Sequence, residues 1–205
     1  MELKNNKTLT RKEKEYLYHK KDIMWFAVEV FGKYGYETAT TAEISDSAGY
    51  AKGSLYVYFK NKRELFLEVV NEILNDIVEI IDESFVQSNA QQCIEKYFEN
   101  LGDYFNANRS AYELLMREGY TLQKGELEKE NPALSRRIIQ LNRMIAKKLS
   151  SFIELKNFDK DELEYIVTLL HTSFFFSQMK INFSPKKKGK ILKMLTKITF
   201  EGILN

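Results

Sequence analysis

The stretch TTAEISDSAGYAKGSLYVYFKNK, at residues 40–62, decides the fold because it predicts two short helices joined by a tight turn. Thr40 and Glu43 have the spacing of a capping box, so the first helix is expected to begin there. Ile44 starts the apolar side of that helix. Gly49 is expected to end it, because glycine tolerates the positive φ angle that a helix C-terminus often needs.

The second helix of this stretch is expected to open at residues 52–54. Leu55 and Phe59 lie about one helical turn apart and form its inward side. Two helices in this arrangement form a helix-turn-helix, whose second helix can lie in the major groove of DNA. The outward side of this second helix carries side chains with polar tips, namely Lys52, Ser54, Tyr56 and Tyr58.

The segment before this motif predicts one more helix and a polar N-terminal arm. Apolar residues recur at helical spacing between Asp22 and Tyr34, and Gly35 closes that helix. Residues 1–20 are polar and rich in lysine, so we expect a solvated, partly frayed terminus. The alternative is an arm that contacts phosphates or enters a minor groove of DNA.

The rest of the chain predicts further helices. Asn61 has the position of an N-cap, with Glu64 as its capping-box partner, for a long helix that reaches about Phe85. The fold class is therefore all-α, with a three-helix head at residues 1–66 joined by the long helix to a helical second domain at residues 67–205. Beyond the long helix, helices are expected at residues 90–105, 110–118, 132–154, 159–182 and 185–204, with a polar loop at 123–132.

Composition is that of an ordinary globular chain. Of 205 residues, 44% are hydrophobic and 29% are charged, and the net charge is +2. Residues 1–62 carry 11 Lys and Arg against 8 Asp and Glu, so the basic excess lies with the helix-turn-helix. No apolar run is long enough to cross a bilayer, and the N-terminus lacks the apolar core of a signal peptide. We therefore expect a cytoplasmic protein.

Residue clusters that would carry catalysis or bind a metal are missing from the sequence. The single Cys93 excludes an internal disulfide and fits a reducing cytosol. Neither a CxxC pair nor a His/Cys cluster is present, and no group of His, Cys, Asp or Glu has the spacing of a metal or acid–base site. We therefore expect no enzymatic activity, no metal and no cofactor.

Residues 23–69 resemble the N-terminal DNA-binding domain of the tetracycline-repressor (TetR) family of bacterial transcription regulators. The resemblance covers the first third of the chain, and the remainder agrees only in length and helical character. The shared features lie in one register and are Phe31 at the end of the first helix, Gly35-Tyr36, Thr40-Thr41, Glu43-Ile44, Ala48-Gly49, Lys52-Gly53-Ser54-Leu55-Tyr56, Tyr58-Phe59, Lys62 and Leu65.

The resemblance and the chemistry of the side chains together predict the residues that contact DNA. Thr41 and Lys62 match family positions that contact phosphate. Lys52 can reach guanine acceptors or a phosphate, and Gly53 lets the backbone approach DNA closely. Tyr50 is expected either to stack on a thymine methyl group or to cover the turn. The full predicted set is Thr41, Tyr50, Ala51, Lys52, Gly53, Ser54, Tyr56, Tyr58 and Lys62.

The second domain is rich in aromatic and sulfur-containing side chains, and the family binds small molecules between helices of this part. Any one such side chain is more often part of a core than of a binding site. A lone histidine on a helix is likewise more often hydrogen-bonded packing than a ligand contact. The predicted lining of an effector pocket is Phe105, Tyr112, Glu113, Met116, His171, Phe175 and Met179, with Glu113 and His171 as polar anchors.

The resemblance also implies a homodimer. In relatives the last two helices pair across a two-fold axis, a role that residues 160–182 and 187–204 suit here. The run FFF at 174–176 agrees, because successive helical residues lie about 100° apart and three phenylalanines cannot face one core. We therefore expect a dimer that binds a palindromic operator in double-stranded DNA, with no membrane partner.

The function that the resemblance implies is transcriptional repression, relieved when a small apolar or aromatic effector binds. The sequence leaves open an activator, and also a regulator of the same fold that a protein partner controls. A helical small-molecule carrier or enzyme with an incidental helix-turn-helix is the remaining alternative.

Overall fold

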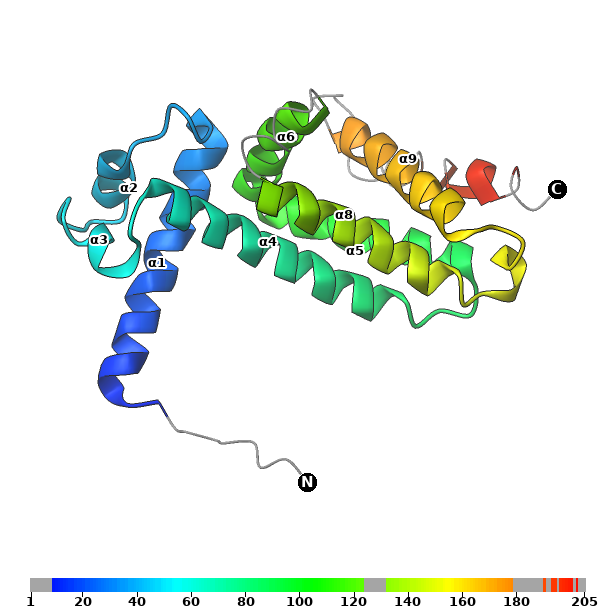
Figure 1. Cartoon of the computed structure of the whole chain (residues 1–205), viewed down its shortest axis with the longest axis horizontal. Coiled ribbons are helices and arrows are strands. Elements are labelled where there is room, and N and C mark those ends of the chain that lie inside the picture. Colours follow the sequence, from blue (N-terminus) through cyan, green and yellow to red (C-terminus); the bar gives the residue numbers. More distant parts are fainter. Residues whose placement is uncertain are drawn as a thin grey trace.

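The chain folds into helices, and the expectation of an all-α protein is confirmed. The computed structural model describes residues 9–123, 132–178, 190, 193–194, 196–200 and 202, and these residues contain no strand. A helical head lies at one end of the molecule, and the long helix α4 (Lys62–Ser84) leads from it into a layered body of helices (Figure 1).

The head consists of α1 (Arg11–Tyr34), α2 (Thr41–Ser47) and α3 (Leu55–Tyr58), packed around the start of α4 (Lys62–Ser84). Each helix contributes its apolar side to one core, which holds the head together by removing that surface from water. Its buried members are Ile23, Ala27, Val30, Phe31, Ile44, Leu55, Phe59, Leu65 and Phe66.

Helix α1 begins well before its predicted start near Asp22, so the expectation of a frayed terminus is wrong for residues 11–20. Thr10 and Glu13 form a capping box that satisfies backbone N–H groups at this N-terminus. The spacing is visible in the sequence but lies outside the apolar stripe from which the helix was predicted. A local capping signal thus extends α1 by several turns.

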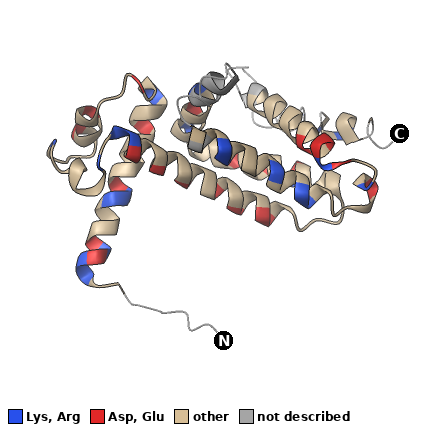
Figure 2. Cartoon of the chain, viewed as in Figure 1, with Lys and Arg blue, Asp and Glu red and all other residues tan. Residues whose placement is uncertain are grey.

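Helix α4 starts and ends close to the predicted residues. The Asn61 side chain accepts a hydrogen bond from the backbone N–H of Glu64 at 2.8 Å, which confirms the predicted N-cap. One side of α4 is buried from Leu65 to Ile81, whereas acidic residues recur along its exposed side (Figure 2). The helix belongs to both parts of the molecule.

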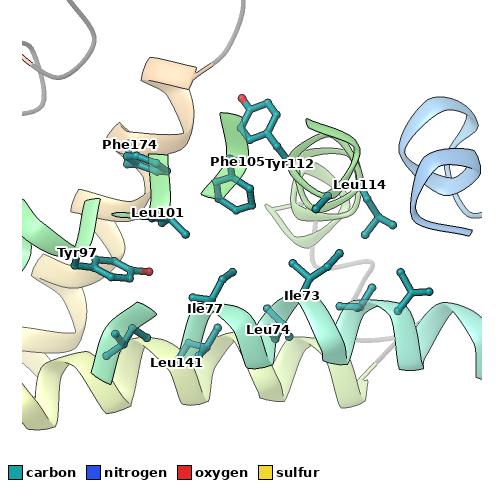
Figure 3. Packing of buried hydrophobic residues seen from close by; sticks show 14 of the residues in the cluster. Ile73, Leu74, Ile77, Tyr97, Leu101, Phe105, Tyr112, Leu114, Leu141 and Phe174 are labelled. Carbon is teal, nitrogen blue, oxygen red and sulfur yellow. The ribbon is translucent and has the colours of Figure 1, made fainter. Parts of the chain in front are cut away.

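The body consists of α5 (Ala90–Ala107), α6 (Arg109–Gln123), α8 (Pro132–Leu149), a short 3-10 helix (Ile153–Leu155) and α9 (Lys160–Gln178). Helices α5 and α8 lie along α4, and α9 packs on α8 (Figure 1). Their apolar sides meet in a continuous core in which Phe105 and Leu101 of α5 face Ile73, Leu74 and Ile77 of α4 (Figure 3).

Four of the predicted helices of the body are found, and two of them end elsewhere, whereas the predicted last helix at residues 185–204 lies mostly outside the described residues. Helix α6 continues past its predicted end at residue 118 to Gln123. Helix α8 stops at Leu149 and not at residue 154. The hydroxyls of Ser150 and Ser151 donate to carbonyl groups of its last turn at 2.8 and 2.7 Å, and such bonds compete with continuation of the helix.

Helices α1 and α6 form the joint between head and body. Their backbones meet at Gly32, where a Cβ atom would lie 2.6 Å from the Ser110 carbonyl oxygen. The Arg117 guanidinium donates to the carbonyl oxygens of Gly32 and Lys33 at 2.9 and 3.0 Å, at the C-terminal end of α1. A cation at this end also complements the helix dipole. The joint therefore depends on close backbone approach and on one arginine.

Candidate nucleic-acid interface

The turn between α2 and α3 is built by local signals. The Thr40 hydroxyl accepts a hydrogen bond from the backbone N–H of Glu43 at 3.2 Å, and the Glu43 carboxylate accepts one from the Thr40 N–H at 2.8 Å. Gly49 has a φ angle of 72°. The backbone N–H groups of Gly49 and Tyr50 donate hydrogen bonds to carbonyl oxygens in the last turn of α2. These bonds form a Schellman motif, which directs the chain from α2 into α3.

The second helix begins slightly later than predicted. Residues 52–54 form a turn, and α3 itself starts at Leu55. The turn is already wound, because the Ser54 N–H donates to the Ala51 carbonyl at 2.8 Å with the spacing of a 3-10 helix. Leu55 and Phe59 are buried, as predicted for the inward side.

The opposite side of this element is exposed, and we call it the recognition face: Ala51, Lys52, Gly53, Tyr56 and Val57. Lys52 makes no hydrogen bond or ion pair with another described residue. A Cβ atom on Gly53 would meet nothing within 4 Å, and its φ angle is not positive, so the fold does not require glycine there. Neither Lys52 nor Gly53 is therefore needed for the packing or hydrogen bonding of the described residues.

Tyr56 links the recognition face to the start of α2. Its side chain is 55% exposed, and its hydroxyl lies 3.2 Å from the Thr41 hydroxyl oxygen. The structure thus brings these two predicted DNA contacts together beside the N-terminus of α2. Backbone N–H groups at a helix N-terminus attract anions, so this position suits a phosphate.

Sequence reasoning missed Val57, which is 67% exposed. The signal was present, because Leu55 and Phe59 both point inward and the residue midway between them must point outward. An apolar side chain held out to solvent on this face can contact the methyl group of thymine.

Tyr50 points away from the recognition face and covers the turn, which is one of the two predicted alternatives. Its hydroxyl donates to the Asp22 carboxylate at 3.0 Å and lies 2.6 Å from His19 Nδ1. Because its one proton goes to Asp22, His19 Nδ1 acts as the donor. Burial and the nearby carboxylate raise the pKa of Tyr50 to about 12, so the phenol stays neutral. Tyr50 therefore ties the turn to α1.

Two further predicted residues are only partly available to DNA. Ser54 and Tyr58 are half-buried. The Tyr58 ring packs against the Tyr16 ring with centroids 4.9 Å apart, so it supports the N-terminal turns of α1. The predicted set is thus divided between a recognition face and the contacts that support it.

Lys62 is engaged inside the head. Its ammonium group donates to the carbonyl oxygens of Tyr36, Glu37 and Ala39 at 2.7, 3.1 and 3.0 Å and lies 4.6 Å from the Tyr36 ring centroid. A lysine has three donors, so all are used. In this arrangement Lys62 fastens α4 to the segment between α1 and α2. Lys60 and Arg63, two residues before it and next to it in the chain, are exposed.

The aromatic residues predicted to line a pocket in the body come together from three helices. Phe105 of α5, Tyr112 of α6 and Phe175 of α9 have ring centroids 5.6 to 6.4 Å apart. Phe105 and Tyr112 are almost fully buried, and the Tyr112 hydroxyl donates to the Phe175 carbonyl oxygen at 3.3 Å. These rings pack on one another; Figure 3 shows Phe105 and Tyr112 side by side.

His171 lies beside this cluster and is hydrogen-bonded on both sides. Its Nε2 lies 2.8 Å from the Tyr97 hydroxyl, and its Nδ1 lies 2.8 Å from the Asn142 side-chain oxygen. The phenol donates to Nε2, and Nδ1–H donates to the amide oxygen, which requires a neutral ring. Burial lowers the pKa of His171 from 6.5 to about 4. This histidine connects α5, α8 and α9.

The remaining pocket predictions do not join the cluster as expected. Glu113 is half-exposed and pairs with Arg109 one turn earlier, so it faces outward. Met116 is partly buried against the core. Met179 lies outside the described residues.

A surface cleft of about 340 Å³ lies elsewhere, between α1 of the head and α4, α5 and α6 of the body. None of the predicted pocket residues lines it. Within the described residues, no group of three or more His, Cys, Asp or Glu is arranged to hold a metal ion. No helix among those residues has the length and apolar character needed to cross a membrane.

Sequence comparison matches residues 23–69 to the family described as bacterial regulatory proteins, tetR family. The transcriptional regulator QacR of Staphylococcus aureus is 46% identical over 52 residues, which are 25% of this chain and 28% of that protein. The chain spans about a third of the length of the curated relatives that it matches. Two of these are named as HTH-type transcriptional regulators, and a third is named as a fatty acid metabolism regulator protein.

Similarity to solved structures extends over nearly the whole chain. A TetR-like transcriptional regulator from Rhodococcus sp. RHA1 covers 95% of this chain and all of its own length, with a TM-score of 0.68 and 17% identity. The regulator FadR of Bacillus subtilis, in complex with stearoyl-CoA, covers 90% of this chain and 97% of its own, with a TM-score of 0.59 and 17% identity. At these identities the likeness shows the fold: a helix-turn-helix head on a helical body.

Proposed function

Because residues 23–69 place this chain in the tetR family of bacterial regulatory proteins, we propose that it binds specific DNA sites and regulates transcription. The observation that carries the proposal is the recognition face. Lys52 and Gly53 are exposed on a turn whose direction is fixed by a capping box and a Schellman motif, and neither residue has a structural duty there. A bacterial regulator of this kind acts in the cytoplasm, where its DNA lies.

The contacts that we propose follow from the geometry of this face. The hydroxyl groups of Thr41 and Tyr56 donate hydrogen bonds to one phosphate at the N-terminus of α2. This contact positions the head on DNA. Lys52 reaches a guanine edge or a phosphate, and Gly53 allows the backbone to come close to DNA. Val57 contacts a thymine methyl group. Lys62 and Tyr50 support this surface from within the head.

We further propose that the protein acts as a homodimer through its last two helices. Helix α9 has two apolar sides. Leu163 and Val167 lie on the side that is buried in the body, whereas Tyr165 and Leu169 are 66% and 50% exposed on the other. Near the C-terminus, Met194 and Ile198 are also exposed. A second copy of the chain would cover these side chains and present two heads to a palindromic operator, about 34–36 Å apart.

The body is the proposed site of an effector that releases DNA. A small apolar or aromatic molecule would enter beside Phe105, Tyr112 and Phe175, whose mutual packing it would replace. The FadR structure contains stearoyl-CoA, and that protein shares this fold. The effector must bind the released state more tightly than the DNA-bound state, because only differential affinity shifts the equilibrium. The division at residue 66, which we propose as the domain boundary, lies inside the continuous helix α4.

Fluorescence anisotropy with fragments of native upstream DNA, at two salt concentrations, tests the DNA-binding proposal. We expect tight binding to a palindromic fragment that weakens as salt rises, because bound phosphates release counterions. Lys52→Ala should lower the affinity and reduce the salt slope by about one. Lys147→Ala, an exposed lysine on α8, is the matched control and should change neither. Equal, weak binding of all fragments by the wild type and Lys52→Ala would contradict the proposal.

The effector proposal is tested on the same DNA complex with a panel of apolar and aromatic compounds that includes stearoyl-CoA. Release of DNA by a panel member, lost in Phe175→Leu, supports it. Unchanged DNA affinity across the panel contradicts it.

A further inference from the structure

The cleft between head and body is separate from the aromatic cluster proposed for an effector. One wall is α1, which contributes Met24, Trp25 and Val28. The other walls are the middle of α4 and the segment where α5 ends and α6 begins, including Tyr104. A volume of about 340 Å³ lies at the lower end of the range for small-molecule sites.

Part of the lining of this cleft is apolar and includes an exposed tryptophan. Trp25 is 59% exposed, although it is the largest apolar side chain in the protein and the sequence gives it no place in the apolar stripe of α1. Its ring packs edge-on against Phe26 with centroids 4.8 Å apart, so the indole is supported and not freely mobile. An exposed indole offers a flat apolar surface on which an aromatic group can stack.

Three acidic residues also belong to the lining of the cleft. They are Glu29 of α1 and Glu72 and Asp76 of α4. The Asp76 carboxylate accepts a hydrogen bond from the Tyr104 hydroxyl at 2.9 Å, which holds it in place without neutralising it. After Arg63, α4 carries acidic residues and no basic one (Figure 2). The field at this wall is therefore negative.

Two basic residues also line the cleft, and neither cancels this field. Arg109 is engaged by Glu113 at 3.2 Å, and its guanidinium carbon lies 4.5 Å from the Tyr112 ring centroid. Lys21 is 77% exposed at its side chain and lies 3.8 Å from Glu72, a long and solvated pair. Such pairs contribute little, so a bound cation can displace Lys21.

We propose that this cleft binds a small organic cation that carries a flat apolar group. The apolar group lies on Met24, Val28 and the indole of Trp25. The charged end faces Glu72 and Asp76. Charge complementarity argues against an organic anion, because three carboxylates surround the site and both lysine and arginine are paired.

Such a ligand would touch the head and the body at once, next to the α1–α6 joint at Gly32. Binding would fix the position of α1 relative to α4 and so change the placement of the recognition face. This consequence rests on the proposed DNA-binding function, whereas binding of the cation does not.

The binding test uses the full chain without DNA, so its result is independent of the proposed function. Trp25 is the only tryptophan in the sequence, and its emission therefore reports on the cleft alone. Titration with benzyltrimethylammonium should give a saturable change in emission and a matching calorimetric isotherm. Benzenesulfonate, which has a similar size and the opposite charge, should give neither. Equal binding of both ions, or binding of neither, would overturn the proposal.

Two double variants of acidic residues on α4 test which carboxylates attract the cation. Glu72→Gln with Asp76→Asn should weaken benzyltrimethylammonium by about three- to tenfold, the range for two partly solvated charges. Glu79→Gln with Glu83→Gln removes two charges from the same helix outside the cleft and should leave the affinity unchanged. Lys21→Met should tighten binding, because it frees Glu72. A uniform effect of both acidic pairs would mean that the field of the whole helix, and not this cleft, attracts the cation, and would overturn the proposal.

Discussion

The head and the body differ in whether their polar side chains are exposed to solvent or hydrogen-bonded to one another. In the head, Lys52 and Tyr56 are held out to solvent on a rigid turn. In the body, Tyr97, His171 and Asn142 are hydrogen-bonded to one another in a partly buried chain. A surface for a large polar partner needs groups that are still available, whereas a core needs every buried donor paired. The head would therefore need no rearrangement for the proposed binding to DNA.

The body, by contrast, must open to admit an effector among its aromatic rings. Phe105 and Tyr112 are packed on Phe175, and Tyr112 is also hydrogen-bonded to the α9 backbone. The cleft beside Trp25 is already open and lies between the two regions. The molecule thus has an exposed surface on the head, an open cleft between the two regions and a closed core in the body. Four predictions test this comparison of head and body.

The largest effect is expected for Phe174→Ala in the body. Phe174 is fully buried and stacks on Phe98 with centroids 5.0 Å apart, so its loss leaves a cavity and costs about 3–5 kcal/mol. We expect α2 and α3 to lose protection together with the body, because the α1–α6 joint couples them. Hydrogen exchange with mass spectrometry measures this. Unchanged protection of α2 and α3 would show that head and body unfold independently.

A pH titration of stability follows from the buried histidine. The folded pKa of His171 lies near 4, below its ordinary value of 6.5. As the pH falls, the histidine is therefore protonated in the unfolded chain before it is protonated in the folded protein. The contribution of neutral His171 to the free energy of unfolding is fully present above about pH 6.5 and is lost as the pH falls towards 4. The loss amounts to about 3 kcal/mol. Urea unfolding between pH 7 and 4 should show a shallower pH dependence in His171→Gln; identical slopes would contradict a neutral, buried ring.

Gly32→Ala tests the joint between the two regions. The added Cβ would meet the Ser110 carbonyl oxygen at 2.6 Å, so α1 and α6 must separate. We expect a loss of about 1–3 kcal/mol, as for other overpacked sites, despite the better helix propensity of alanine. Thermal unfolding measures the loss. A variant as stable as the wild type would show that the joint tolerates displacement.

Gly53→Ala is expected to have the smallest effect on stability and a selective effect on binding. Open space surrounds this position, so the fold should be unchanged or up to about 1 kcal/mol more stable through the unfolded state. DNA affinity should nevertheless fall, because the methyl group would lie between the backbone and DNA. Gly49→Ala is the contrast, since its φ angle of 72° makes it destabilising in the free protein. If Gly53→Ala bound DNA with the affinity of the wild type, the proposal that the backbone at Gly53 comes close to DNA would be wrong.

Much of the head could be predicted because its signals are local. The capping box at Thr40, the glycine at position 49 and the inward pair Leu55 and Phe59 each act within a few residues, and all are found in the structure. The capping box at Thr10, which starts α1 at Arg11, is an equally local signal, but it lies outside the apolar stripe from which the helix was predicted. Val57 was missed although its neighbours determine its direction.

The roles of Tyr50 and Lys62 could not be predicted from spacing. Tyr50 turns inward because α1 offers Asp22 and His19, and Lys62 turns inward because three carbonyl groups converge on it. These partners lie 23 to 31 residues away in the sequence. A polar side chain near a motif thus faces DNA or the core according to which partners the fold brings within reach.

The sequence by itself determined the helix-turn-helix, the helical class and the family resemblance, because caps, glycines and apolar periodicity act over one or two turns. Only the tertiary structure decided which polar groups remain exposed, where α1 meets α6, and that the aromatic residues of the body fill one another's space. It also placed Trp25 beside Glu72 and Asp76, on helices that are far apart in the sequence. Burial and hydrogen-bond satisfaction depend on all neighbours at once, and these are set only when the chain has folded.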